Sequence, residues 1–285
     1  MLVKKNKFGA KFNATQFSPG GGIGRHKGLK IPRQKCHAGS SPAPGTNMLT
    51  EKVIEINHWS DRIFSFKTTR SESFRFNSGE FAMIGQNINN KNIIRAYSIV
   101  SPPWADYLEF LSIKNVGLLT DQISNMGQGD DVLLLPKCTG TLRNTFLTEG
   151  GKRLVLLATG TGLAPFMSTI RDIDLIEAYE EIHLVHSVRD RDDLAYWYEL
   201  LSVFENEPDL HELLKDKLEY TALITGQGDP RIDARFIQAD DRVMACGNLQ
   251  FNYDVVEWCK ALGMTEGSNR TPGQFVIEKA FVDQT

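Results

Sequence analysis

The sequence of 285 residues lacks the features that define several protein classes. No apolar run approaches the ~20 residues that span a bilayer, and the longest, residues 154–158, has the length of a strand. No Cys-x-x-Cys pair occurs among the cysteines, which are Cys36, Cys138, Cys246 and Cys259. This spacing argues against an iron–sulfur cluster, a structural zinc site and a secreted disulfide framework. A reducing compartment is expected, and the scattered histidines predict no metal site.

Acidic residues are absent before Glu51, in a stretch that holds nine Lys or Arg. The whole chain carries a net charge of −3, but the other 23 basic residues face 35 acids, so the remainder carries −12. The stretch also contains three consecutive glycines at 20–22 and a run of small residues at 39–45. Such a composition cannot bury a core, so residues 1–47 are expected to form a basic disordered leader.

Three interpretations of this leader stay open. An organelle transit peptide fits the lack of acids, although more Arg and Ser would be expected. A basic arm for an acidic partner is the second. The favoured third is a linker, or a start codon assigned too early with Met48 the true start. No apolar segment suits a secretory signal, so a cytoplasmic location is expected, with organellar import through the leader as the alternative.

The hydrophobic pattern changes once after residue 48. Short segments with alternating apolar and polar residues are typical of a small antiparallel barrel, and they lie at 53–56, 63–67, 96–100, 108–113 and 132–135, with a helix at 119–126. Strands then alternate with helices, the strands at 154–158, 183–188, 220–225, 243–246 and 275–281 and the helices from about 164, at 194–204 and at 253–262. This order predicts a β-barrel domain at 48–148 and a doubly wound α/β domain with a parallel sheet at 149–285.

The segment after the strand at 154–158 is the strongest single motif. It contains Gly160 and Gly162, and glycines let the backbone approach a phosphate without interference from a Cβ atom. Pro165 then presets φ for a first helical turn, whose N-terminus attracts a pyrophosphate. Pro165 replaces the third glycine of the usual dinucleotide fingerprint, so an ordinary tight turn is the alternative.

The tetrapeptide from Arg95 to Ser98 begins a predicted barrel strand. Arginine offers a fork for phosphate, tyrosine a flat ring for stacking and serine a small hydroxyl. Alternation puts Arg95 and Tyr97 on one face and Ser98 on the other. The alternative is a surface arginine with a half-buried tyrosine, which the pattern alone favours.

Together these motifs resemble the bacterial ferredoxin/flavodoxin–NADP reductases. The matching segments occur in family order over about 52–282, at 76–85, 95–99, 108–114, 117–120, 139–142, 158–166, 188–189, 245–247 and 276–282. The resemblance implies a ferredoxin reductase-like fold, with a β-barrel FAD domain followed by an NADP-binding domain. It also implies an enzyme that exchanges electrons between NADP(H) and ferredoxin or flavodoxin, with hydride transfer between nicotinamide C4 and flavin N5.

The resemblance assigns FAD to the first domain and to the C-terminus. Arg95, followed by Ala96, would meet the pyrophosphate, Tyr97 would pack on the isoalloxazine, and Ser98 would lie near N5. Ile113 and Lys114 would line the flavin, and Gly117, Leu118, Leu119 and Thr120 would cradle the FAD phosphates. Ala280 and Phe281 would lie against the flavin and yield to the nicotinamide.

The resemblance assigns NADP to the second domain. The turn of Thr159, Gly160, Thr161 and Gly162 would face the dinucleotide, and Arg189 and Arg231 would hold its 2′-phosphate. Cys246 and Gly247 would lie at the nicotinamide end, although a small buried strand-end thiol is the alternative for Cys246. The implied catalytic residues are Ser98, Tyr97, Cys246 and Glu278, with Ser98 aiding proton balance at N5.

Two departures from the family pattern affect cofactor binding. Gly226 stands where the family carries an arginine for the 2′-phosphate, and the segment 227–241 is short. Losing one charge-assisted contact of ~1.5–3 kcal/mol weakens the preference for NADP without abolishing it, and Asp229 and Asp233 are expected to weaken it further. The loop after Lys114 is also short and lacks the usual arginine after Thr120, so FAD is expected to be held less tightly.

Three other functions remain as alternatives. One is a general flavin reductase or the reductase component of an oxygenase. A second is a redox-inactive binding module, which Gly226 and the short loop favour. Nucleic-acid binding would rest on the leader alone, and the acidic body argues against it. A monomer without a membrane or nucleic-acid partner is expected.

Overall fold

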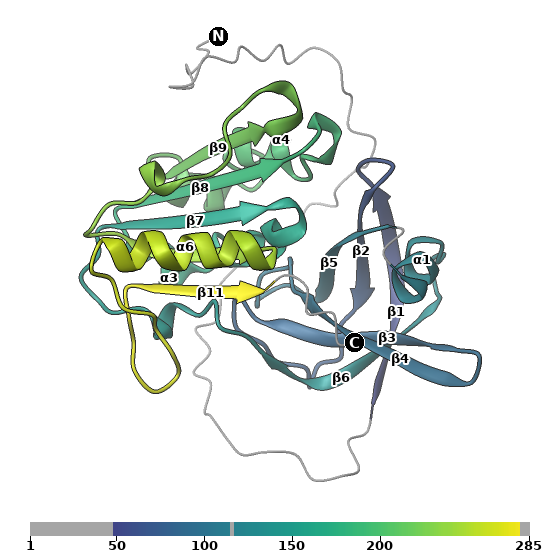
Figure 1. Cartoon of the computed structure of the whole chain (residues 1–285). Coiled ribbons are helices and arrows are strands. Elements are labelled where there is room, and N and C mark those ends of the chain that lie inside the picture. Colours follow the sequence, from purple (N-terminus) through teal and green to yellow (C-terminus); the bar gives the residue numbers. More distant parts are fainter. Residues whose placement is uncertain (1–47, 115–116, 280–285) are drawn as a thin grey trace. The chain divides into compact units, whose positions relative to one another are not determined.

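The computed structural model describes residues 48–114 and 117–279 (Figure 1). The predicted leader, residues 115–116 and the predicted flavin residues Ala280 and Phe281 lie outside the described residues.

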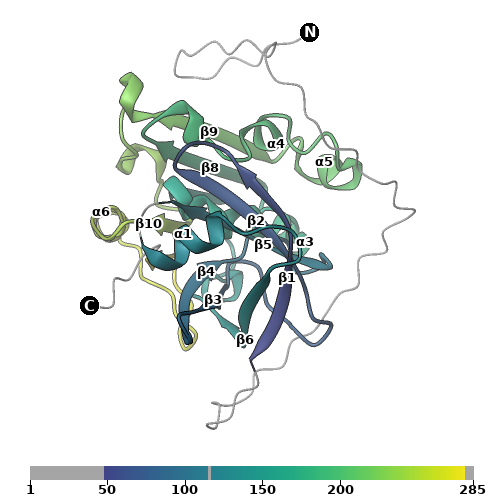
Figure 2. The same ribbon diagram turned by 90° about the vertical axis from the view of Figure 1, so that its right-hand side faces the viewer.

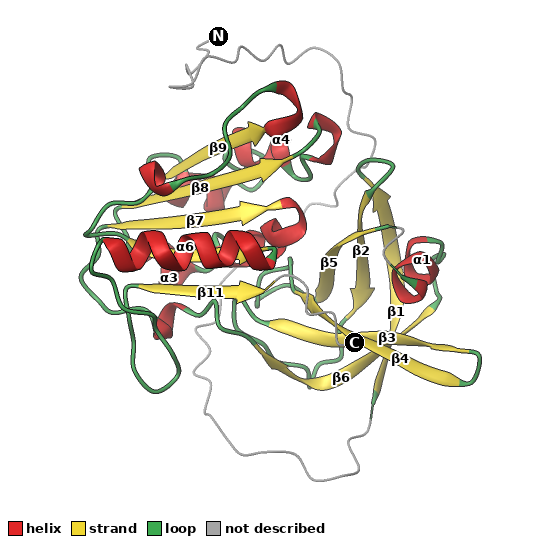
Figure 3. Ribbon diagram, viewed as in Figure 1, coloured by secondary structure: helices red, strands yellow, loops and turns green. Residues whose placement is uncertain are grey.

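The first part of the chain forms a six-stranded antiparallel sheet (Figure 3). Its order is β4-β3-β6-β1-β2-β5, and the strands are β1 (Leu49–His58), β2 (Ile63–Thr69), β3 (Phe81–Ile88), β4 (Lys91–Ser98), β5 (Tyr107–Ile113) and β6 (Asp131–Thr139). The two outer strands meet just beyond the end of β4, where Ile99 pairs with Phe110. This bridge closes the sheet into a barrel. Helix α1 (Leu118–Ser124) connects β5 to β6.

The barrel encloses an aromatic and aliphatic core. Phe64 and Phe66 of β2 are buried inside it, and the Phe66 ring lies 5.2 Å from that of Phe110 on β5. Burial of each such side chain contributes about 1.5–3 kcal/mol. The alternate residues Ile63 and Leu111 belong instead to the cluster shared with the second part of the chain. Strands β2 and β5 are therefore covered on both faces.

The second part forms a parallel sheet in the order β11-β10-β7-β8-β9. Its strands are β7 (Arg153–Thr159), β8 (Glu181–Val188), β9 (Leu218–Ile224), β10 (Arg242–Gly247) and β11 (Phe275–Lys279). The helices are α2 (Ala164–Thr169), α3 (Ile173–Ala178), α4 (Trp197–Leu201), α5 (Pro208–Leu214) and α6 (Leu249–Ala261). The strand order reverses between β7 and β10, and ligands of such folds bind at that reversal.

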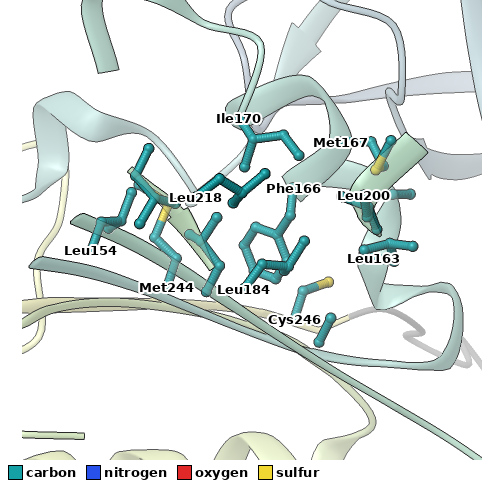
Figure 4. Packing of buried hydrophobic residues seen from close by; sticks show 14 of the residues in the cluster. Leu154, Leu163, Phe166, Met167, Ile170, Leu184, Leu200, Leu218, Met244 and Cys246 are labelled. Carbon is teal, nitrogen blue, oxygen red and sulfur yellow. The ribbon is translucent and has the colours of Figure 1, made fainter. Parts of the chain in front are cut away.

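Apolar side chains project from both faces of this sheet. In β7, Leu154 and Leu156 join one cluster, which includes Phe166 of α2 (Figure 4). Val155, on the opposite face, joins the cluster that contains Val255 of α6. Figure 2 accordingly shows α6 on one side of the sheet and α4 and α5 on the other. The predicted fold, a barrel followed by a doubly wound α/β domain, is confirmed.

The strand predictions were more accurate than the helix predictions. Each predicted strand from 53 to 246 overlaps an observed one, whereas β3, α3 and α5 were not predicted. The predicted helix at 194–204 is reduced to α4, because Tyr196, Val203 and Phe204 adopt left-handed φ angles of 57°, 51° and 57°. The proposed boundaries of the two domains stay a prediction.

Candidate active site

The turns that follow β7 and β10 pack against each other where the strand order reverses. A Cβ atom on Gly162 would lie 2.2 Å from the Cys246 carbonyl oxygen, and one on Gly247 would lie 2.3 Å from Thr159 Oγ1. Both positions therefore need glycine for the mutual packing of the turns. Gly160 differs, because its φ is +54° and an added Cβ atom would meet nothing within 4 Å. The structure thus brings together the predicted residues of both turns.

The carboxylate of Glu278, near the end of β11, lies at the same edge. Thr141 donates its backbone N–H to Glu278 Oε2 at 3.0 Å, and the Ser98 hydroxyl donates to Glu278 Oε1 at 3.4 Å. Ser98 ends β4 of the barrel, so two predicted catalytic residues from different parts of the chain are in contact. Cys246 is the register partner of Glu278 in the β10–β11 pair.

Burial makes the Glu278 carboxyl unusually basic. Its residue is 8% exposed, and desolvation raises its pKa to about 7 against the lowering effect of the hydrogen bonds from Thr141 and Ser98. The charge of Glu80 adds to the rise. Near neutral pH the group is therefore divided between its protonated and charged forms, as proton exchange requires.

The Cys246 side chain lies in the hydrophobic core rather than in an open site. The residue is 1% exposed and belongs to the same buried cluster as Met244 and Leu163 (Figure 4). Burial, with a smaller contribution from Glu278, raises the pKa of the thiol well above its usual range. The described contacts of Cys246 with the predicted nucleotide turn are those of its backbone carbonyl. A catalytic role for the thiol stays a prediction that this burial does not favour.

The predicted flavin residues of β4 differ sharply in exposure. Arg95 and Ala96 are exposed. The Tyr97 ring is buried edge-on against the rings of Phe66 and Phe110, with its centroid 6.3 Å from each of theirs. The Tyr97 hydroxyl is buried near Ser112 without a hydrogen bond of normal geometry, and burial raises its pKa to about 12. An exposed guanidinium and an unpaired buried hydroxyl on one strand fit a cofactor that combines phosphates with a polar ring, as FAD does.

The other predicted flavin residues lie at the end of β5 and on α1. Lys114 donates from Nζ to the Ser60 carbonyl oxygen at 3.1 Å, and Ile113 is half-buried beside it. Gly117 and Leu118 are exposed, and Leu119 is buried in the barrel core. Thr120 Oγ1 donates to the Gly117 carbonyl at 2.8 Å. Gly117 and Leu118 are thus the exposed residues of the predicted phosphate cradle.

The predicted 2′-phosphate residues flank a tight contact between two loops. The Gly226 N–H donates to the Arg189 carbonyl at 2.8 Å, and a Cβ atom on Gly226 would lie 2.5 Å from that oxygen. The approach explains why a larger residue is disfavoured at position 226. The side chains of Arg189 and Arg231 are both exposed.

The two nearby aspartates are engaged in local contacts. Asp229 accepts a hydrogen bond from the Ile224 N–H at 2.8 Å, and Asp233 pairs with Arg235 at 2.7 Å. Asp233 is therefore paired with a counter-charge, whereas the described partner of Asp229 is a neutral N–H, so the predicted weakening of NADP binding by these two residues stays a prediction.

Three residues that contact this region had no assigned role in the sequence analysis. Asn252 of α6 donates from Nδ2 to the carbonyls of Gly247, at 3.3 Å, and Glu278, at 2.9 Å. Thr141 donates its backbone N–H to the Glu278 carboxylate, and the His186 ring is hydrogen-bonded to the Gly160 carbonyl. Two of them carried a signal in the sequence: His186 is a polar residue inside an apolar strand, and Thr141 lies in the family-matching segment 139–142.

An ion-pair cluster ties the first turn of the barrel to the loop after β8. Arg62 donates to Asp190 at 2.8 Å and also contacts the buried carboxylate of Asp193. The Ser60 hydroxyl donates to Asp193 at 2.9 Å. Because Arg189 precedes these aspartates, the cluster restrains the loop that carries a predicted NADP residue.

Comparison with known proteins defines the class. One family model, described as an oxidoreductase FAD-binding domain, matches residues 48–137, and another, described as an oxidoreductase NAD-binding domain, matches residues 156–256. The chain is therefore an oxidoreductase with an FAD-binding and an NAD-binding domain.

Individual relatives define the family. The chain is 39% identical over 253 residues to the flavodoxin/ferredoxin–NADP reductase of Rhodobacter capsulatus, covering 82% of this chain and 93% of that one. It is 36% identical over 262 residues to the ferredoxin–NADP reductase of Azotobacter vinelandii, covering 84% and 100%. A ferredoxin NADP⁺ reductase structure from Neisseria gonorrhoeae, with bound FAD and NADP, matches with a TM-score of 0.73 and 27% identity over 82% of this chain and 99% of that one. The chain belongs to the ferredoxin–NADP reductase family, as the resemblance predicted.

Two further observations concern membranes, metals and location. Among the helices of residues 48–114 and 117–279, none is long and apolar enough to cross a membrane, and no group of three or more potential ligands there suits a metal ion. The relatives named above are bacterial, and they give no support to organellar import.

Proposed function

We propose that this chain is an FAD-dependent reductase that exchanges electrons between NADP(H) and ferredoxin or flavodoxin. The observation that carries the proposal is the contact of Ser98 with Glu278 beside the end of β10, where Cys246 and Gly247 lie. The Ser98 hydroxyl of the barrel thereby contacts the proton-exchanging carboxylate of Glu278 in the parallel sheet. This contact lies at the edge of the sheet where dinucleotides bind in such folds. The electron partner is taken from the names of the relatives.

FAD is assigned to the barrel. When bound, it exchanges a hydride with the nicotinamide and single electrons with the carrier. Arg95 supplies a guanidinium for its phosphates, and Tyr97 supplies an aromatic ring with an unpaired hydroxyl. Ser98, Ile113, Lys114 and the first turn of α1 complete the proposed surface. Residues 48–148 and 149–285 are the corresponding FAD and NADP domains.

NADP is assigned to the parallel sheet. The turn Thr159–Gly162 offers backbone to its pyrophosphate, and the exposed Arg189 and Arg231 offer charge to its 2′-phosphate. Cys246 and Gly247 shape the nicotinamide end through their backbone. The predicted preference for NADP is therefore retained without an arginine at position 226.

The proposed role of Ser98 and Glu278 is to hold and move a proton. The hydroxyl can relay a proton to the carboxylate, whose pKa of about 7 lets it accept or release one near neutral pH. The Thr141 N–H fixes the second carboxylate oxygen and so sets the direction of the first. Removing either side chain should therefore slow turnover more than it weakens NADPH binding.

Anaerobic turnover with NADPH and purified ferredoxin or flavodoxin tests this function. Wild-type protein should reduce the carrier, and Ser98→Ala and Glu278→Gln should lower kcat about 10- to 100-fold with KM for NADPH little changed. Reduction of free flavin but of neither carrier would instead favour a flavin reductase. No reduction of any acceptor would overturn the proposal.

A further inference from the structure

A buried histidine lies directly behind the predicted dinucleotide-binding turn. His186, on β8, is 1% exposed, and its Nε2 atom lies 3.0 Å from the Gly160 carbonyl oxygen. Its Nδ1 atom lies 3.3 Å from the hydroxyl of Tyr220 on β9. Three elements of the sheet edge are therefore linked through one imidazole ring.

The chemistry of the three groups fixes the direction of both hydrogen bonds. A backbone carbonyl only accepts, so His186 Nε2 must carry the proton and donate to Gly160. In a neutral ring Nδ1 is then the acceptor, and the Tyr220 hydroxyl donates to it. Burial lowers the pKa of His186 to about 4, with opposing effects from the Gly160 carbonyl and Asp193, so the ring is neutral at physiological pH. Tyr220 thus selects the tautomer that holds Gly160.

The bond to Gly160 also determines where the next amide points. In a trans peptide the C=O and the following N–H are antiparallel. Because the Gly160 carbonyl points inward to His186, the Thr161 N–H points away from the buried sheet. Gly160 has a φ of +54°, an added Cβ atom there would meet nothing within 4 Å, and the residue begins the short 3₁₀ helix Gly160–Leu163. The bond from His186 therefore adds a second restraint on this peptide to the weak one of a single 3₁₀ turn.

We infer that His186 is a positioning residue for NADP, which keeps the Thr161 N–H directed at the bound dinucleotide by holding the Gly160 carbonyl. This inference rests on the proposed function, because it requires the turn Thr159–Gly162 to meet the dinucleotide. Tyr220 acts through His186 by fixing its tautomer. Neither side chain touches the ligand.

A pair of substitutions at His186 separates hydrogen bonding from packing. Glutamine places an amide N–H near the position of Nε2, whereas the shorter asparagine places its amide near Nδ1 and cannot reach Gly160. His183→Asn is the matched control, since His183 is buried on the same strand and bonds Thr221 rather than the turn. NADP⁺ binding to the FAD-loaded protein is measured by titration calorimetry, together with KM and kcat for NADPH and the melting midpoint.

The expected result is a change in binding without a change in chemistry. His186→Asn should weaken NADP⁺ binding about tenfold and raise KM equally, with kcat within about twofold of wild type. His186→Gln and His183→Asn should both bind NADP⁺ within about twofold of wild type. Tyr220→Phe should weaken binding less than His186→Asn does.

Two outcomes would overturn the inference, and they differ from failure of the proposed function. The inference is overturned if His186→Asn binds NADP⁺ as tightly as wild type does, or if His183→Asn weakens binding as much as His186→Asn does. If wild-type protein neither binds NADP⁺ nor accepts electrons from NADPH, the proposed function itself fails.

Discussion

Ser98 and Glu278 are 180 residues apart in the chain, yet the Ser98 hydroxyl donates a 3.4 Å hydrogen bond to the Glu278 carboxylate. The strand that ends in Ser98 belongs to the barrel, and the strand that carries Glu278 belongs to the parallel sheet. Asn252 fixes the same strand by donating to the Glu278 carbonyl at 2.9 Å. The barrel therefore holds the carboxylate of Glu278, and α6 holds the backbone of the strand that carries it.

The raised pKa of Glu278 makes stability depend on pH. The folded protein holds this proton up to about pH 7, whereas the unfolded chain releases it near 4.5. The contribution to stability is complete below pH 4.5 and is lost as the pH rises through 7. The loss should be on the order of 3 kcal/mol, and Glu278→Gln should abolish it. Denaturant unfolding of the FAD-loaded protein from pH 5 to 8 measures the difference between the two proteins.

The exposed Glu205 provides the control for this measurement. Glu205→Gln should follow the wild-type pH dependence, because its carboxylate is in solvent in both states. Parallel curves for wild type and Glu278→Gln would show that Glu278 does not titrate as described.

The packing of the two turns predicts a selective effect of Gly162→Ala. The new Cβ atom would lie 2.2 Å from the Cys246 carbonyl oxygen, so one of the two turns must move. NADP⁺ binding should weaken by about 10-fold or more, while FAD content is retained because the barrel is not altered. Calorimetric titration with NADP⁺ and the flavin absorbance measure the two effects.

Gly127→Ala is the matched substitution outside this region. The nearest atom to its added Cβ atom is the Asp130 carboxylate oxygen at 3.9 Å, which is ordinary contact. It should leave NADP⁺ binding unchanged. If Gly162→Ala also binds NADP⁺ normally, close packing of the turns is not needed for the nucleotide site.

Gly226→Ala should reduce the preference for NADPH over NADH. Its Cβ atom would lie 2.5 Å from the Arg189 carbonyl oxygen and displace the backbone that carries this guanidinium. KM for NADPH should rise about fivefold and KM for NADH should not change, because NADH lacks the 2′-phosphate. Steady-state kinetics with both nucleotides test this. An equal rise for both would place Arg189 outside 2′-phosphate recognition.

Removal of Arg62 should destabilise the protein by leaving the buried Asp193 carboxylate with the Ser60 hydroxyl as its described partner. Arg62→Ala should lower the free energy of unfolding by about 1–3 kcal/mol. Lys152→Ala is the control, since its 3.3 Å pair with Glu180 is highly exposed and should contribute less than about 0.5 kcal/mol. Similar losses for both variants in urea unfolding would contradict a special role for Arg62.

Local periodicity predicted most of the fold because strands of both types leave clear patterns. The apolar run at 154–158 lies within β7, and the alternating segment at 63–67 lies within β2. Strand β3 was missed as a strand because Gly85 interrupts its pattern. An added Cβ atom there would lie 1.9 Å from the Ile93 carbonyl oxygen, so glycine serves the close approach of β4.

The site was predicted only where its residues are neighbours in sequence or match the family. Thr159, Gly160 and Gly162 follow one strand and could be identified locally. Thr141 and Asn252 could not, because they reach Glu278 across 137 and 26 residues. For Cys246 the sequence left two interpretations open, a residue at the nicotinamide end and a buried strand-end thiol, since a strand-end residue can face either way.

Anaerobic mixing of the purified yellow protein with NADPH and, separately, with NADH tests the central claim most directly. Loss of the flavin absorbance reports electron transfer from the nicotinamide to FAD. Rapid bleaching by NADPH and slow bleaching by NADH is the predicted result, because the proposed role of Arg189 and Arg231 is to bind the 2′-phosphate that NADH lacks. Bleaching by neither nucleotide would contradict the assignment of this chain as an NADP-linked flavoprotein reductase.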